Sequence, residues 1–321
     1  MKLPSKLLFM FLLISSTYLV ASSSNWLTTW MGLEVNMLSY IPLIFMKEST
    51  SESEAAVKYL IPQSLGSAIF ISSAIISMYL NNLQILMLIA MCLKLGVAPF
   101  HYWFPPVMLT LQLMPAFILL TWQKIAPILA ISSFNPLLIK MIMPIAVISS
   151  LWGGIGGINQ TDIRSLLTYS SIAHTGWMLA SIYSNYSILA SYLLSYILIN
   201  MSIYFLLYKE DNKSCKQLFS PKEPSKTFML SISILSLGGL PPLVGFIMKL
   251  LVLMFTSAKM AIILGLIMGA LISLFYYLSL TFSTLLSFSK MHLTKYKTIS
   301  KNLMMFFLIQ ILPLILILFF F

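Results

Sequence analysis

The chain has 321 residues, of which 59% are hydrophobic and only 8% are charged, and it carries a formal net charge of +11. The long apolar runs and a mean hydropathy of +0.95 indicate a membrane protein without a soluble catalytic domain, because the longest polar stretch, residues 209–226, is too short to fold alone. The positive charge predicts lysine-rich loops on one side of a membrane and no binding of nucleic acid.

The N-terminal segment fits two interpretations. Lys2 and Lys6 precede an apolar run over residues 7–20, which is typical both of a secretory signal peptide and of a first transmembrane span. We favour a first span, because ten further spans are predicted and multi-span proteins commonly insert through their first.

A span needs about 20 apolar residues, and this length predicts an all-α, polytopic membrane protein with about eleven transmembrane helices in a single membrane domain over residues 1–321. The fourth span continues past Pro99 as a half-helix over residues 100–108, and the ninth is interrupted at Gly238-Gly239-Leu240-Pro241-Pro242. In chain order the predicted spans are residues 7–22, 26–45, 59–80, 83–98, 111–134, 137–158, 163–183, 188–208, 228–256, 261–288 and 303–320.

Positive charge segregates across these spans. Nearly all lysines outside the spans share one side with the N-terminus, and the other side receives only Lys140 and Lys259. Because basic loops are retained on the cytoplasmic or matrix side, the N-terminus is predicted to face that compartment.

Four charged side chains lie deep inside the predicted spans, far from the span ends: Glu34, Lys94, Lys124 and Lys249. At 1.5 Å per residue, all four lie about 10–20 Å from a membrane face, within one broad central layer. A charge at this depth costs a few kcal/mol, so these residues indicate an ion or proton path. Lysine suits such a path because burial and a neighbouring carboxylate change its proton affinity in opposite directions, whereas arginine does not deprotonate in proteins.

The first ten spans form two groups of five, residues 7–134 and 137–288, followed by an extra C-terminal helix over residues 303–320. An odd number of spans in each group gives the groups opposite orientations, so we expect two inverted repeats. The fourth span of each group is broken and carries a lysine, Lys94 in the first and Lys249 in the second. Breaks at matching places in inverted repeats indicate a transport site.

The remaining candidate ligands do not form a metal site. Cys92 and Cys215 make no CxxC pair, so neither a disulfide framework nor an iron–sulfur site is predicted. His174 lies about 17 Å into the seventh span. It fits two roles equally, a proton relay between the repeats or an imidazole hydrogen-bonded to a serine or a backbone carbonyl.

The sequence resembles a known family at segments that occur in order between Trp26 and Leu253. Together these segments are similar to the subunit 2 family of NADH dehydrogenase (ubiquinone), the mitochondrially encoded, antiporter-like subunits of respiratory complex I, and the composition is arthropod-like. The segments are WMGLEVN (residues 30–36), LKLGVAPFHYWFP (93–105), TWQKIAP (121–127), GGINQT (156–161), YSSIAHTGW (169–177) and SLGGLPPLVGF (236–246).

The resemblance implies a role for each buried charge. Glu34 would pair with Lys94 and tune its proton affinity, Lys124 would connect two half-channels, and Lys249 would pass protons toward the exit side. His174 is a further candidate for proton transfer. The subunit would pump protons through a central row of lysines, driven by electron transfer from NADH to ubiquinone elsewhere in the complex.

The resemblance also implies partners, location and the absence of a cofactor. The chain itself would bind no NADH, FMN, iron–sulfur cluster or ubiquinone, which would reside in other subunits. Its partners would be membrane-arm subunits on both flanks, accessory subunits and lipids such as cardiolipin. It would lie in the mitochondrial inner membrane with its N-terminus in the matrix.

Other interpretations compete with this one. Glu34 and Lys94 can form a static ion pair that fixes helix packing, and Lys249 can snorkel toward the nearer membrane face. A stand-alone antiporter that exchanges Na⁺ or K⁺ for protons would show the same lysines and repeats. A structural scaffold without an ion path would tolerate replacement of the lysines by methionine.

Overall fold

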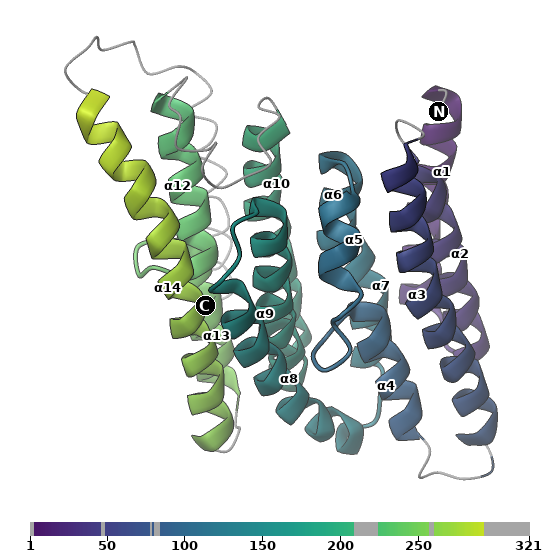
Figure 1. Ribbon diagram of the computed structural model, residues 1–321. Helices are drawn as coiled ribbons and strands as arrows, with labels where there is room; N and C mark the ends of the chain where they lie inside the picture. The colour runs from purple at the N-terminus through teal and green to yellow at the C-terminus, as the bar shows by residue number, and fades with distance from the viewer. Residues whose placement is uncertain are drawn as a thin grey trace. The chain divides into compact units, whose positions relative to one another are not determined.

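The computed structural model describes residues 3–45, 49–77, 79, 84–208, 224–256 and 260–291, and every regular element within these ranges is a helix (Figure 1). This confirms the predicted all-α class. The chain divides into two compact units, Met1–Ile145 (unit 1) and Ala146–Phe321 (unit 2). The predicted span 303–320 and Cys215 lie outside the described residues.

Unit 1 is built around α3, which packs against α2, α4 and α5, while α7 packs against α1, α2, α4 and α6. The buried residues of α3 recur every three or four positions, so one face of this helix points into the unit. Its helices are α1 (Leu3–Ser22), α2 (Trp26–Ile44), α3 (Thr50–Ser77), α4 (Gln84–Leu95), α5 (Phe104–Thr110), α6 (Leu113–Leu120), α7 (Trp122–Ser132) and the first part of α8 (Pro136–Gly157).

Unit 2 is built around α9, which is buried on nearly every face and contacts α10, α13 and α14. Glycines let α8 approach its neighbours closely. A Cβ on Gly153 would lie 2.5 Å from the amide nitrogen of Ala173 in α9, so only glycine allows this close approach. Its helices are the second part of α8, α9 (Ile163–Ser184), α10 (Tyr186–Tyr208), α12 (Pro224–Gly238), α13 (Val244–Phe255) and α14 (Met260–Met291).

The predicted spans between residues 7 and 288 all fall on helices. Within the described ranges, six helical segments are long and apolar enough to cross a membrane, and α4, α12 and α13 contribute shorter apolar helices. The two other predicted spans are α2 and α9, whose buried polar side chains lower their hydropathy. Two boundaries differ from the prediction. The half-helix after α4 begins at Phe104, because turns occupy residues 99–103, and the fifth span is divided at Thr121.

Candidate functional site

The break after α4 in unit 1 ends the helix with a left-handed glycine. Gly96 has a φ of 65°, a conformation that glycine adopts at little cost. The N–H groups of Gly96 and Val97 donate to the carbonyls of Leu93 (3.2 Å) and Cys92 (3.1 Å), which is a Schellman motif. The glycine and the following proline therefore produce the predicted interruption by a defined local geometry.

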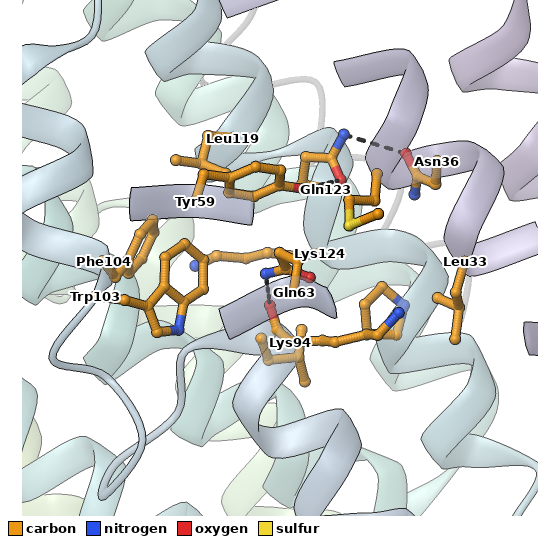
Figure 2. Close-up of a pocket in the computed structure, with 13 residues that line it drawn as sticks. Leu33, Asn36, Tyr59, Gln63, Lys94, Trp103, Phe104, Leu119, Gln123 and Lys124 are labelled. Atoms are coloured by element: carbon orange, nitrogen blue, oxygen red, sulfur yellow. Dashed lines mark hydrogen bonds between the residues drawn. The ribbon is translucent and has the colours of Figure 1, made fainter. Parts of the chain in front are cut away.

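Neighbouring side chains satisfy the carbonyls at this helix end. The indole Nε1–H of Trp103 donates to the carbonyl of Leu93 (3.1 Å), and the Nε2 amide of Gln63 donates to the carbonyl of Lys94 (2.9 Å; Figure 2). Backbone carbonyls at membrane depth need partners because lipid offers none. The amine of Lys94 donates to neither of these carbonyls.

The Lys94 side chain is buried, and its Nζ atom has no hydrogen-bond partner. Glu34 is half-buried on α2, the helix that also supplies Leu33 and Asn36 to the surroundings of this amine. Among the described residues, however, no ion pair joins the two, so the structure does not form the predicted contact. The cause is the rotation of α2, which turns Leu33 and Asn36 toward Lys94 and places Glu34 on the adjoining face.

Lys124 enters unit 1 from a second interrupted helix. α6 and α7 are separated at Thr121, and Pro127 lies in the following turns. Proline removes a backbone donor and its ring crowds the carbonyl four residues earlier, so the helix is distorted in the turn before it. The Lys124 side chain is only 3% exposed. Its Nζ atom lies 5.7 Å from the centre of the Phe104 ring, within the range of a cation–π contact.

A small cavity in unit 1 is lined by both lysines. It encloses about 20 Å³ of space open to a water-sized sphere, and one water needs about 10–15 Å³ on that measure. Figure 2 shows the two lysine side chains beside this cavity, extending in different directions from α4 and α7. The other lining residues are Leu33, Asn36, Met37, Tyr59, Gln63, Leu95, Trp103, Phe104, Leu119, Gln123 and Pro127.

A polar chain borders the cavity. The hydroxyl of Tyr59 donates to Oε1 of Gln123 (3.3 Å), and Nε2 of Gln123 donates to Oδ1 of Asn36 (3.1 Å; Figure 2). Amide, phenol and amine groups thus surround a space that can hold water. Such a site can pass a proton between hydrogen-bonded groups without a metal or a redox cofactor.

The break between α12 and α13 in unit 2 uses the same backbone device. Gly239 has a φ of 82°. The N–H groups of Gly239 and Leu240 donate to the carbonyls of Ser236 (3.2 Å) and Leu235 (3.5 Å), again a Schellman arrangement. The sequence prediction of matching interruptions in the two halves of the chain therefore extends to the hydrogen bonds that end each helix.

Lys249 itself satisfies the open end of α12. Its Nζ donates to the carbonyls of Gly238 (2.9 Å) and Leu237 (3.2 Å) and lies 6.0 Å from the centre of the Trp177 ring. A cation is favoured at this position because the C-terminal end of a helix carries partial negative charge. The side chain is 7% exposed, so it does not snorkel to a membrane face.

The backbones of α12 and α13 approach each other closely at Gly245. A Cβ at this position would lie 1.8 Å from the carbonyl oxygen of Ser236. Any side chain here would force the two half-helices apart. The glycine therefore holds Lys249, one turn further along α13, against the end of α12.

His174 is buried in α9 and pairs with a tyrosine. Its Nδ1 atom lies 2.8 Å from the hydroxyl of Tyr192, and the ring of Tyr196, one turn further along α10, lies 5.3 Å away centre to centre. Tyr192 is a partner that the sequence reasoning did not consider. A histidine can gain or lose a proton at near-neutral pH, and the bond to the phenol fixes the orientation of its ring.

Sequence reasoning located the lysines but missed the polar groups that surround them. Gln63 and Tyr59 follow each other at helical spacing on the buried face of α3, and this pattern of polar residues in an apolar span is the signal that could have identified them. Within the described ranges, no three histidine, cysteine or carboxylate side chains gather to hold a metal ion. Cys92 is a buried free thiol.

Comparison with known proteins gives consistent matches along the chain. Residues 23–82 and 77–273 match the family described as NADH:quinone oxidoreductase/Mrp antiporter, transmembrane region. NADH-ubiquinone oxidoreductase chain 2 of Dasypus novemcinctus is 38% identical over 297 residues, which covers 88% of this chain and 86% of the relative. The protein of the same name from Crocidura suaveolens gueldenstaedtii is also 38% identical, over 87% of this chain and 86% of its own.

Solved structures share the fold. A chain of respiratory complex I from Thermus thermophilus with bound aureothin superposes with a TM-score of 0.80 at 25% identity, over 87% of this chain and 70% of that chain. A chain of the Mrp complex from Dietzia sp. DQ12-45-1b has a TM-score of 0.71 at 18% identity, over 88% of this chain and 59% of that one. At this identity the second likeness concerns the fold alone.

Proposed function

Because this chain belongs to the chain 2 family of NADH-ubiquinone oxidoreductase, we propose that it translocates protons through its buried lysines as an antiporter-like subunit of the membrane arm of respiratory complex I. The observation that supports this proposal is the pair of lysines, Lys94 and Lys124, beside one polar cavity in a lipid-embedded unit. Protonatable groups inside a membrane protein are costly and characteristically mark such paths.

In the proposed mechanism, Lys94 is the group that changes its proton occupancy most readily. Its amine is buried without a hydrogen-bond partner, so no fixed contact holds it in one protonation state. Glu34, on α2, is the carboxylate with which this amine pairs when the two groups approach. Water in the cavity carries the proton between Lys94 and Lys124, the central lysine of the path.

In unit 2, Lys249 holds a proton at the end of α12 and passes it toward the exit side. The carbonyls of Leu237 and Gly238 accept hydrogen bonds from its amine, so the charged form is stabilised while the contact lasts. His174, hydrogen-bonded to Tyr192, relays protons between the two halves of the chain. Together Glu34, Lys94, Lys124, His174 and Lys249 form the proposed proton path.

The assembly supplies the rest of the reaction. We place FMN, the iron–sulfur clusters and the ubiquinone site in other subunits, and electron transfer there drives the proton movements here. Other membrane-arm subunits flank this chain, and accessory subunits and lipids such as cardiolipin cover its exposed apolar side chains, among them Phe11, Leu137 and Phe275. The location is the mitochondrial inner membrane, with the N-terminus in the matrix.

Replacement of Lys94 by arginine tests whether this lysine releases its proton. Arginine keeps the positive charge but does not deprotonate in proteins. We expect the assembled complex, reconstituted in vesicles, to translocate fewer protons per NADH oxidised than the wild type. Normal translocation by Lys94→Arg would mean that the residue provides only a fixed charge, as in a static pair with Glu34.

Replacement of Tyr192 by phenylalanine tests the role of His174. The change removes only the hydroxyl that bonds the imidazole, and such a bond contributes about 0.5–1.5 kcal/mol. We therefore expect proton translocation to slow by about twofold to tenfold, with normal assembly. Tyr186→Phe, at an exposed position of the same helix, is the control. Equal rates in both variants would remove His174 from the path.

A further inference from the structure

Unit 1 contains a buried carboxylate that the lysine path does not include. Glu52, in the first turn of α3, is 1% exposed and accepts a hydrogen bond from the Nε2 amide of Gln112. Gln112 precedes α6, the half-helix that leads toward Lys124. Burying an ionised carboxylate costs free energy unless it is paired or hydrogen-bonded, so a buried carboxylate calls for a structural or functional reason.

The charges on α3 mark where this helix leaves the apolar layer. α3 has 28 residues, or about 42 Å, which exceeds the roughly 30 Å of hydrocarbon in a bilayer. Its charged residues, Glu52, Glu54 and Lys58, all precede Tyr59, and the remaining stretch carries no charge. Glu52 therefore lies at the aqueous edge, although its own side chain is enclosed by protein.

The buried face of α3 connects Glu52 to the lysine cavity. Glu52, Tyr59 and Gln63 share this face, and Tyr59 lies two turns, or about 10 Å, beyond the carboxylate. Between them lie only small side chains on the same face, Ala55 and Ala56. Tyr59 lines the cavity together with both lysines.

A second tyrosine extends this connection on the α6 side. The hydroxyl of Tyr40 donates to the carbonyl of Pro115 (2.8 Å), in the first turn of α6, and its ring lies 5.0 Å from that of Tyr59. Tyr40, on α2, thus lies beside both Tyr59 of α3 and the first turn of α6, the half-helix that precedes Lys124.

We propose that Glu52 is the proton-entry group of unit 1, an inference that rests on the proposed function. The carboxylate takes a proton from water at the membrane edge and becomes a neutral carboxyl group. The proton then moves through internal water along α3, past Tyr59, to the amine of Lys124. Glu52 returns to its ionised form and accepts the next proton.

A purely structural role makes different predictions. An acidic residue in the first turn stabilises a helix through its dipole, and Glu54, also near the start of α3, shares that effect. Glu54 is 56% exposed and paired with Lys58. If the helix dipole were all that mattered, removing the carboxylate of Glu54 would have the same consequence as removing that of Glu52.

The test compares four variants in the assembled complex reconstituted in vesicles, with protons translocated per NADH oxidised and assembly measured together. Glu52→Gln keeps the volume of the side chain but replaces the carboxyl group by an amide, which cannot take up and release a proton. We expect it to reproduce the loss caused by Lys124→Met. Glu52→Asp restores much of the translocation, whereas Glu54→Gln translocates normally.

The outcomes separate this inference from the proposed function. If Lys124→Met abolishes translocation while Glu52→Gln translocates normally, Glu52 is not an entry group. If Lys124→Met itself translocates normally, the proposed lysine path is wrong. Equal losses in Glu52→Gln and Glu54→Gln would show a structural role. Should Glu52→Gln not assemble, Glu52→Ser replaces it with the same expected loss, and normal translocation by Glu52→Ser overturns the inference.

Discussion

Lys124→Met is expected to abolish the proton translocation that this chain performs while the complex still assembles. Methionine preserves the volume and the apolar stem of the side chain beside Phe104 but carries no proton. Groups that transfer protons typically contribute about 10²–10⁴-fold to a rate. The measurement is the number of protons translocated per NADH oxidised by reconstituted complex, with assembly followed on native gels.

Lys58→Met is the matched control for this experiment. Lys58 is an exposed lysine of α3 that pairs with Glu54, four residues earlier on the same helix. Such surface pairs contribute little to stability, so the control should assemble and translocate protons normally. A Lys124→Met complex that is as active as the Lys58→Met complex would favour the scaffold interpretation.

Gly245→Ala is expected to prevent stable assembly. The added methyl group would lie 1.8 Å from the carbonyl oxygen of Ser236. The oxygen is a backbone atom, and the position of the methyl carbon is fixed by the backbone of α13. Overpacking of a core typically costs about 1–3 kcal/mol, and this contact cannot be relieved by rotation of a side chain. Separating α12 from α13 would also break the hydrogen bonds of Lys249. The amount of assembled complex on native gels measures the effect.

Gly238→Ala provides the comparison at the same helix break. Here the nearest atom to a new Cβ is in the ring of Tyr277, at 3.2 Å, so a small movement of a side chain makes room. We expect this variant to assemble at close to the normal level. Equal assembly of both alanine variants would show that the approach of α12 to α13 is less constrained than the structure indicates.

The sequence predicted the helices and their interruptions because both depend on local chemistry. Apolar runs of sufficient length define spans, and glycine followed by proline ends a helix in a recognisable way. The same local reasoning located Lys94 and Lys249 beside the breaks. Their burial followed from their position in apolar segments, and the structure agrees.

The contacts of the candidate site were not predictable in the same way. The missing ion pair between Glu34 and Lys94 depends on the rotation of α2 within unit 1, and the partner of His174 comes from a different helix, α10. The hydrogen bond to Glu52 comes from Gln112, 60 residues away in the sequence. Packing between helices decides each of these contacts, and one sequence does not encode that packing in any short pattern.

The two broken helices end in the same backbone motif but differ in what closes them. At α4 the carbonyls are satisfied by neutral groups, the indole of Trp103 and the amide of Gln63, which titration of the neighbouring lysine leaves untouched. At α12 the closing group is the titratable amine of Lys249. Loss of its proton would replace charge-assisted hydrogen bonds, worth about 1.5–3 kcal/mol each, by weaker neutral ones and so loosen the contact at the end of α12. Proton transfer at Lys249 therefore changes the bonds that close its helix end, whereas proton transfer at Lys94 does not.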